Sequence, residues 1–195
     1  MNYSFLYSGP LLFKSSLKES DRLALLDISN KNKKIKFNKE LSGYIKEEYK
    51  IKNLNPVKKI LKDNIDDFVE CYEHWYGKQV MSVEFKNGWT NFMKAHEYNP
   101  PHVHQNCNFA SVFYLDVPEE IKKEENILKT NGSQPGNITF QFHTNVNGYI
   151  QNHRHEPKTG DFFIFPATLI HTVNPFYSKV TRISMAINFE VTEVR

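Results

Sequence analysis

The stretch GDFFIFPATLIHTVNP, Gly160 to Pro175, has the pattern of a deeply buried β-strand followed by a turn and a second short strand. Gly160 and Asp161 are turn residues, and the four residues that follow are apolar on both faces of the strand. Pro166 ends that strand because proline cannot donate to a ladder. His171 then lies inside an apolar run, where a buried imidazole needs a partner. It is either a core histidine bonded to a carbonyl or a metal ligand.

The whole part of the chain that follows Gly77 has a similar, strand-like composition. Segments rich in Val, Ile, Phe and Tyr alternate with Gly, Pro and Asn, which is typical of antiparallel β-structure. The predicted strands are Met81–Phe85, Trp89–Ala95, Phe109–Val117, Asn137–His143, Asp161–Phe165, Leu169–Val173 and Thr181–Val191. These short strands fit a sandwich or a jelly roll, so we expect an α+β, mainly β fold.

The first half of the chain has helical periodicity instead. The predicted helices are residues 20–28, 40–49 and 57–76. Pro56 opens the third helix, in which apolar residues recur every three or four positions and charged residues occupy the other side. That apolar stripe must pack on something, most simply a sheet. The helices are therefore expected to buttress the β-structure.

A chain of 195 residues can bury a substantial core without disulfides or a structural metal, and no linker composition indicates a second domain. We therefore expect one domain over residues 1–195, in which residues 1–80 give helical support to a jelly-roll core over residues 81–195. The only two cysteines, Cys71 and Cys107, are too far apart in sequence for a CxxC pair. They suit a reducing cytoplasm.

The composition also limits the kinds of partner and the location that we expect for the chain. A formal net charge of +3 is small and gives little support to nucleic-acid binding. Residues 1–20 lack the positively charged N-terminal region and the long apolar run of a signal peptide, so we expect a first strand there instead. No apolar run approaches the roughly 20 residues of a membrane span. We expect a cytoplasmic protein, and the high Asn and Lys usage is compatible with an AT-rich, for instance viral, genome. The oligomeric state is open, a homodimer included.

Two His-x-His pairs stand out among the 8 histidines of the chain. His102 and His104 lie in NPPHVHQN, residues 99–106, and open a strand that can fix both rings on one face. His153 and His155 lie in a polar segment that we expect to be exposed. The first pair is the better metal candidate, although this spacing alone does not separate a metal site from two solvated histidines.

The last predicted strand, VTRISMAINFEV, carries an arginine on its inward face. Strict alternation places Arg182, Ser184, Ala186 and Asn188 on one face, while the apolar residues of the other face pack under the helices. A guanidinium in the interior needs an anion. Arg182 therefore binds the anion of a ligand, pairs with a local carboxylate, or points to water in an edge register.

These motifs together resemble the iron(II)- and 2-oxoglutarate-dependent oxygenases, in particular a branch common in phage and bacteria that is distantly similar to prolyl hydroxylases. The resemblance rests on the order HVH, FYL, GDFFIFP, a histidine five residues beyond that proline and an arginine eleven further on, within residues 88–191. It implies a double-stranded β-helix, or jelly roll, that holds Fe(II) near its mouth. It also implies O2 and 2-oxoglutarate as cosubstrates, hydroxylation of a substrate, and release of succinate and CO2.

The resemblance also implies roles for particular residues. His102 and His171 match the two histidine ligands of the family. Arg182 matches the basic residue that binds the far carboxylate of 2-oxoglutarate. Tyr114 falls where prolyl hydroxylases place a tyrosine hydroxyl on the same carboxylate, and Ser184 is a further candidate for that pocket.

One position departs from the family pattern. The usual triad reads His-x-Asp or His-x-Glu, whereas residue 104 is a histidine. We infer a three-histidine site made of His102, His104 and His171, as in some cupin-like dioxygenases, with Glu97 and Asp116 as alternative carboxylates. Replacing a carboxylate by a neutral imidazole raises the net charge of the iron site by one unit and changes its redox properties.

Two other classes of function stay open. A cupin-like metal-dependent isomerase, or a dioxygenase without a cosubstrate, also uses three histidines on a β-fold. In a non-catalytic jelly-roll binding protein the histidines would be incidental. For an oxygenase we expect a small-molecule or peptidyl substrate, with a peptidyl proline as one candidate from the resemblance. Residues 119–134, rich in lysine and glutamate, form either a lid over the site or a solvated surface loop.

Overall fold

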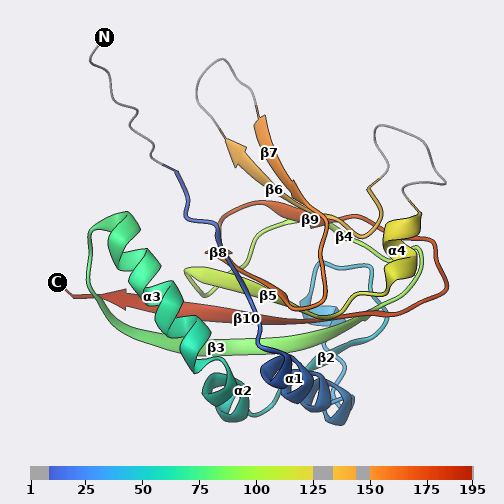
Figure 1. Ribbon diagram of the computed structural model, residues 1–195, viewed down its shortest axis with the longest axis horizontal. Helices are drawn as coiled ribbons and strands as arrows, with labels where there is room; N and C mark the ends of the chain where they lie inside the picture. The colour runs from blue at the N-terminus through green and yellow to red at the C-terminus, as the bar shows by residue number, and fades with distance from the viewer. Residues whose placement is uncertain (1–8, 125–133, 144–149, 195) are drawn as a thin grey trace.

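The chain forms two antiparallel β-sheets, with helices on the outer face of the larger one (Figure 1). The computed structural model describes residues 9–124, 134–143 and 150–194. Within these residues the larger sheet has six strands, in the order β1 (Phe13–Ser16), β8 (Asp161–Pro166), β5 (Phe109–Asp116), β10 (Arg182–Glu193), β3 (Val80–Met93) and β2 (Glu48–Lys50). The smaller sheet has four described strands, in the order β4 (Asn99–His102), β9 (His171–Val173), β6 (Ile138–His143) and β7 (Ile150–His155).

Helices cover the face of the larger sheet that lies away from the smaller one. They are α1 (Glu19–Lys31), α2 (Asn55–Ile60) and α3 (Lys62–Tyr76). Their apolar stripes pack with Met185 and Ile187 of β10 in one core, as the alternation of that strand predicts. Among the described residues, no helix is both long enough and apolar enough to cross a bilayer.

A second core fills the space between the two sheets. Phe163 and Phe165 of β8 meet Phe140 of β6 there, whereas Phe162 and Ile164 belong to the core under the helices. Strand β8 is therefore buried on both faces, which explains why its sequence is continuously apolar rather than alternating. Burial of apolar surface contributes roughly 25 cal/mol per Å², so these buried rings are a main source of the stability of the strand.

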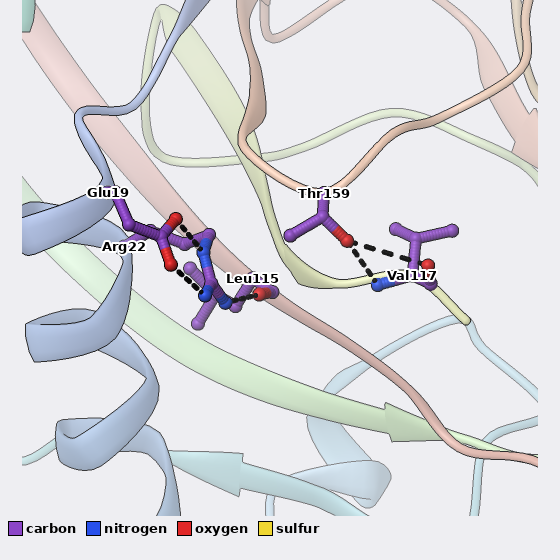
Figure 2. Close-up of polar contacts among 5 residues, drawn as sticks. All are labelled: Glu19, Arg22, Leu115, Val117 and Thr159. Atoms are coloured by element: carbon purple, nitrogen blue, oxygen red, sulfur yellow. Dashed lines mark hydrogen bonds and ion pairs between the residues drawn. The ribbon is translucent and has the colours of Figure 1, made fainter. Parts of the chain in front are cut away.

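The C-terminal end of β5 is fixed from two sides (Figure 2). Arg22 of α1 donates from Nη1 to the carbonyl of Leu115 at 2.6 Å, and its Nε donates to Glu19 at 2.7 Å. From the other side, the N–H of Val117 donates to the hydroxyl of Thr159 at 2.9 Å. The residues just before this point on β5 therefore have little freedom to shift along the sheet.

The helix predicted over residues 40–49 is wrong. The structure has a single 3-10 turn, η1 (Asn38–Glu40), and then strand β2, which pairs antiparallel with Trp89 to Asn91 of β3. Gly43 lies against Asn99, because a Cβ on this glycine would stand 2.0 Å from the Oδ1 of Asn99. Pairing with the sheet thus outweighs the local helix propensity of the segment.

Two further boundaries differ from the prediction. The helix expected over residues 57–76 is interrupted at Leu61, whose backbone angles (φ −83°, ψ 6°) leave the α-helical region while its side chain is fully buried. The strands expected over residues 81–85 and 89–95 are one strand, β3. It continues through a bulge at Lys86, so one extra residue is accommodated and the pairing with β10 resumes.

The insert at residues 119–134 begins with a short helix, α4 (Glu119–Lys123). Ile121 on this helix is buried in the core between the sheets, so this part of the insert is docked rather than a solvated loop. Residues 125–133, on which the lid prediction depends, lie outside the described residues.

Candidate metal centre

His102, His104 and His171 converge beside the core between the sheets. His102 ends β4 and is the register partner of His171, which begins β9, and His104 follows shortly after the end of β4. One potential ligand atom from each lies within 4.8 Å of the other two. In the part of the chain that the structure describes, this is the one place where three His, Cys, Asp or Glu side chains converge so closely. The arrangement can hold a metal ion.

Backbone carbonyls orient two of the three imidazoles. The Nδ1 of His102 lies 2.8 Å from the carbonyl oxygen of Pro100, and the Nδ1 of His171 lies 2.9 Å from that of Leu169. Since a carbonyl only accepts, each Nδ1 carries the proton and each Nε2 keeps its lone pair. Histidines that ligate metals have this arrangement, with the second nitrogen donating to a fixed acceptor.

The spacing of the nitrogens also fits a shared ion. The Nε2 of His104 lies 3.3 Å from the Nε2 of His171. Two ligands at about 2.1 Å from one metal, at roughly right angles, stand about 3 Å apart. Because His171 carries its proton on Nδ1, its Nε2 can accept from an Nε2–H of His104, and a bound ion would take the place of that proton.

The surroundings keep all three rings neutral. Burial lowers the pKa of His102, and it lowers the pKa of His104 to about 3, with the nearby His102 adding to the effect. Burial lowers the pKa of His171 well below its usual value, with contributions from the other two histidines. Metal binding requires the neutral imidazole, so no positively charged ring has to be deprotonated first at neutral pH.

The alternative carboxylates do not join the cluster. The carboxylate of Glu97 accepts the backbone N–H groups of Lys46 and Lys94, at 3.1 and 2.8 Å. Asp116 is the register partner of Ile183 at the end of β5. Neither carboxylate lies in the group of converging ligand atoms. The third member of the cluster, besides His102 and His171, is therefore His104 and not a carboxylate.

A small inner cavity of about 40 Å³ extends from the three histidines into the space between the sheets. Its lining includes Tyr114 of β5 and Arg182 and Ser184 of β10. Arg182 and Ser184 are each 3% exposed and Tyr114 is 1% exposed. The cavity therefore joins the candidate metal ligands to a buried cation.

Arg182 has no carboxylate partner among the described residues. Its Nη1 donates to the carbonyl of Gly136 at 2.6 Å and its Nη2 contacts the sulfur of Met93 at 2.8 Å, while Nε has no partner. The guanidinium carbon lies 5.5 Å from the centre of the Tyr114 ring, and the Tyr114 hydroxyl is also unpaired. A buried charge without a counter-charge and a buried hydroxyl without a hydrogen-bond partner are costly, so this cavity is suited to an anionic ligand.

Burial acts on the pKa of both groups. It lowers the pKa of Arg182, and it raises the pKa of Tyr114 to about 12, an effect that the neighbouring guanidinium opposes. The tyrosine therefore stays a neutral O–H donor, and both groups offer protons to an anion.

The second His-x-His pair does not enter the site. His153 is exposed on β7, as predicted, whereas His155 is half-buried and its Nε2 lies 2.7 Å from the carboxylate of Asp161. This contact ties β7 to the start of β8. The prediction that both histidines are exposed is therefore wrong for His155.

A wider outer cleft lies next to the same histidines and was not predicted. It has a volume of about 440 Å³, and His102, His104 and Trp89 line it as well as the inner cavity. Glu48 and Asn188 line it too. Glu48 could not be found from the sequence because its segment was predicted to be a helix. Asn188 was placed on the inward face of its strand, but nothing in the sequence indicated a cleft there.

Two antiparallel sheets with three converging histidines beside a buried arginine define a β-protein with a candidate metal centre. The family described as "Putative 2OG-Fe(II) oxygenase" matches residues 87–188, more than half of the chain. The chain therefore belongs to the 2OG-Fe(II) oxygenase family, and the resemblance found in its motifs is confirmed. No curated protein matches the sequence.

Solved structures with the same fold include prolyl hydroxylases. A Pseudomonas putida prolyl-4-hydroxylase is 13% identical, with a TM-score of 0.57 over 92% of this chain and 91% of that one. The viral collagen prolyl hydroxylase of Paramecium Bursaria Chlorella virus-1, in a 2OG complex, is 13% identical, with a TM-score of 0.58 over 91% and 94%. A Trichoplax adhaerens prolyl hydroxylase in complex with a hypoxia inducible factor peptide fragment is 11% identical, with a TM-score of 0.57 over 93% and 83%.

Proposed function

We propose that this chain is an Fe(II)- and 2-oxoglutarate-dependent oxygenase that hydroxylates a substrate and releases succinate and CO2. One observation carries the proposal. A buried arginine and a buried tyrosine hydroxyl, both with unpaired polar atoms, line a cavity that ends at three converging histidines. A dicarboxylate can bind the cation with one end and a metal with the other, whereas a metal site alone would not require Arg182.

In this proposal His102, His104 and His171 hold the iron, and two of them are pre-oriented by the carbonyls of Pro100 and Leu169. Bound iron supplies the activation of O2 that is coupled to oxidative decarboxylation of 2-oxoglutarate. A neutral three-histidine set leaves positions on the metal for other ligands, as the facial triad of two histidines and a carboxylate does. It leaves one more unit of positive charge on the metal, which favours binding of an anionic cosubstrate.

Arg182, Tyr114 and Ser184 bind the far carboxylate of 2-oxoglutarate in this assignment. The guanidinium and the phenol donate charge-assisted hydrogen bonds, which are stronger than neutral ones, and water is excluded by the surrounding core. The aromatic ring of Phe165 lies 4.7 Å from that of His171, and the ring of Trp89 lies 5.8 Å from that of His104. These rings restrict the motion of the ligands and keep water away from the metal.

We infer that the two sheets form the double-stranded β-helix, or jelly roll, of the family, within one domain over residues 1–195. The antiparallel pairing throughout the described strands and the likeness to solved oxygenases support this inference. The helices of residues 1–80 then have a supporting role, because their side chains pack on the outer face of the larger sheet.

A cupin-like dioxygenase without a cosubstrate is the second candidate, since the converging set holds three histidines and no carboxylate among the described residues. The two candidates differ in what Arg182 does. In the cosubstrate-free enzyme this arginine would be a structural residue, and its replacement would not alter the response to 2-oxoglutarate.

The test is succinate formation from 2-oxoglutarate by the purified protein with Fe(II) and O2. We expect slow succinate release without a substrate, and none when Fe(II) is omitted or when His171 is replaced by Ala. A chain that binds Fe(II) but makes no succinate would contradict the proposal and support the cosubstrate-free dioxygenase. A chain that binds no divalent metal would support a non-catalytic binding protein.

A further inference from the structure

Among the described residues, the outer cleft is a space beside the candidate metal ligands that the proposed function leaves unassigned. With about 440 Å³ it falls in the size range of small-molecule and side-chain pockets. His102 and His104 form part of its wall, so an occupant would lie next to the metal. The inner cavity is far smaller, about 40 Å³, and already contains the cation that suits the cosubstrate.

Apart from its histidines, the ionisable side chains that line this cleft are carboxyl groups. Glu40 and Glu48 line it, and none of its described lining residues is a lysine or an arginine, although the chain has 25 of these. A substrate with a carboxylate or phosphate would find no counter-charge here. A cation would find the carboxylate of Glu40 and the carboxyl group of Glu48, whose proton it would displace on binding.

Glu48 is the more informative of the two because it is buried. It is 1% exposed, and no ion pair with it occurs among the described residues. Within the described residues its carboxyl group accepts one long hydrogen bond, from the Nδ2 of Asn38 at 3.4 Å. Burial and the proximity of Glu97 raise its pKa to about 8. A buried carboxyl with so little hydrogen bonding has unused capacity to accept from a ligand.

A pair of asparagines that line the cleft has unpaired acceptors as well. Asn188 of β10 and Asn87 of β3 are register partners, and both line the cleft. Asn188 is 5% exposed, and the Oδ1 atoms of both amides are buried without a partner. Buried amide oxygens are normally satisfied, so these two favour a ligand that brings N–H donors.

We propose that the outer cleft binds the reacting part of the substrate as a protonated amine or guanidinium, held by Glu48, Glu40 and the amide oxygens of Asn87 and Asn188. This inference rests on the proposed function and specifies its substrate class. The cation is either a free amine or a lysine or arginine side chain of a peptide, because both present the same chemistry to the cleft. Acidic and purely apolar substrates are excluded from it.

The experiment uses the full chain loaded with Mn(II), without O2, and with 2-oxoglutarate present. The probes are Nα-acetyl-lysinamide, Nα-acetyl-argininamide and the neutral analogue Nα-acetyl-norleucinamide, titrated by calorimetry. We expect at least one cationic probe to bind tenfold or more tightly than norleucinamide. Comparison with agmatine and with the peptide Ac-Ala-Lys-Ala-NH2 separates a free amine from a peptidyl side chain.

Variants locate the binding. Glu48→Gln should reduce the preference for the cationic probe at least tenfold. Glu40→Gln should reduce it several-fold, and because Glu40 is exposed this substitution should have little effect on folding. The matched control is Glu84→Gln, an exposed glutamate on β3 that pairs with Lys86 away from the cleft. It should leave the preference unchanged.

With Fe(II) and O2, the preferred probe should increase succinate formation by the wild-type chain and gain one oxygen atom by mass spectrometry. If succinate forms without substrate but the cationic probes bind no better than norleucinamide, or both cleft variants retain the preference, the inference is wrong while the proposed function stands. If the wild-type chain makes no succinate at all, the proposed function fails and the inference fails with it.

Discussion

The guanidinium carbon of Arg182 lies 5.5 Å from the centre of the Tyr114 ring, with both groups buried and with the Nε of one and the hydroxyl of the other unpaired. The two residues come from neighbouring strands, β10 and β5, in a register fixed by the sheet. Two rigid groups that each keep an unpaired donor atom suit a site preorganised for an anion.

Replacing Arg182 by Gln should weaken 2-oxoglutarate binding about 100-fold, because a desolvated, charge-assisted contact worth roughly 2–4 kcal/mol is lost. Metal affinity should stay the same, since Arg182 is not among the converging ligand atoms. Calorimetry on the Mn(II)-loaded protein measures both. The control is Arg154→Gln, at an exposed position on β7. An unchanged affinity for 2-oxoglutarate in the Arg182 variant would refute this assignment.

Replacing Tyr114 by Phe should have opposite effects on stability and on binding. The hydroxyl is buried and unpaired, so its removal should leave the free energy of unfolding unchanged or raise it by about 1 kcal/mol. Affinity for 2-oxoglutarate should fall about tenfold. Denaturant titration and calorimetry are the measurements. A large loss of stability together with unchanged affinity would mean that the tyrosine is only a core residue.

Replacing His104 by Ala should lower the affinity for Mn(II) or Fe(II) by roughly 100-fold or more, since removal even of an outer partner of a ligand costs about 10–100-fold. His104→Asp should retain the metal, because it restores the carboxylate of the usual triad at the same position. The control is the exposed His153→Ala on β7. Metal affinity in His104→Ala equal to that of the control would show that His104 only lies beside the ion.

Glu48 should make stability depend on pH in the neutral range. Its pKa is about 8 in the folded chain, above its ordinary value near 4.5, so the folded state holds a proton that the unfolded state releases. The free energy of unfolding should therefore fall as pH rises from about 5 to 8, by an amount on the order of a few kcal/mol. Glu48→Gln should remove this decline. Urea titrations at pH 5 and pH 8 test it, and an identical pH dependence in the two proteins would show that the carboxyl is not desolvated.

Part of the centre follows from the sequence because His171 comes shortly after a strongly patterned strand and Arg182 lies in another. The continuous apolar run before Pro166 predicts a strand buried on both faces, and the position of His171 beyond it follows. Strict alternation in β10 predicts that Arg182 and Ser184 face inward while Met185 faces the helices. These features depend on the period of a strand, which is local information.

The parts that could not be predicted depend on contacts between distant segments. Strand β2 is only three residues long and exists because it pairs with β3, so its helical pattern was misleading. Strand β7 is polar, and its pairing with β6 defines it. Glu48 lines the same cleft as His102 and His104 because β2 pairs with β3, and no spacing in the sequence reveals this.

The most direct test of the central claim is whether the three histidines and Arg182 act as one site for 2-oxoglutarate. Calorimetry without O2 should compare the binding of 2-oxoglutarate to the Fe(II)-loaded chain, to the metal-free chain and to the Fe(II)-loaded Arg182→Gln variant. We predict one molecule bound per chain with Fe(II), and affinity at least tenfold weaker when either the metal or the arginine is missing. Equal affinity with and without Fe(II), or no binding to the loaded wild-type chain, would contradict the account.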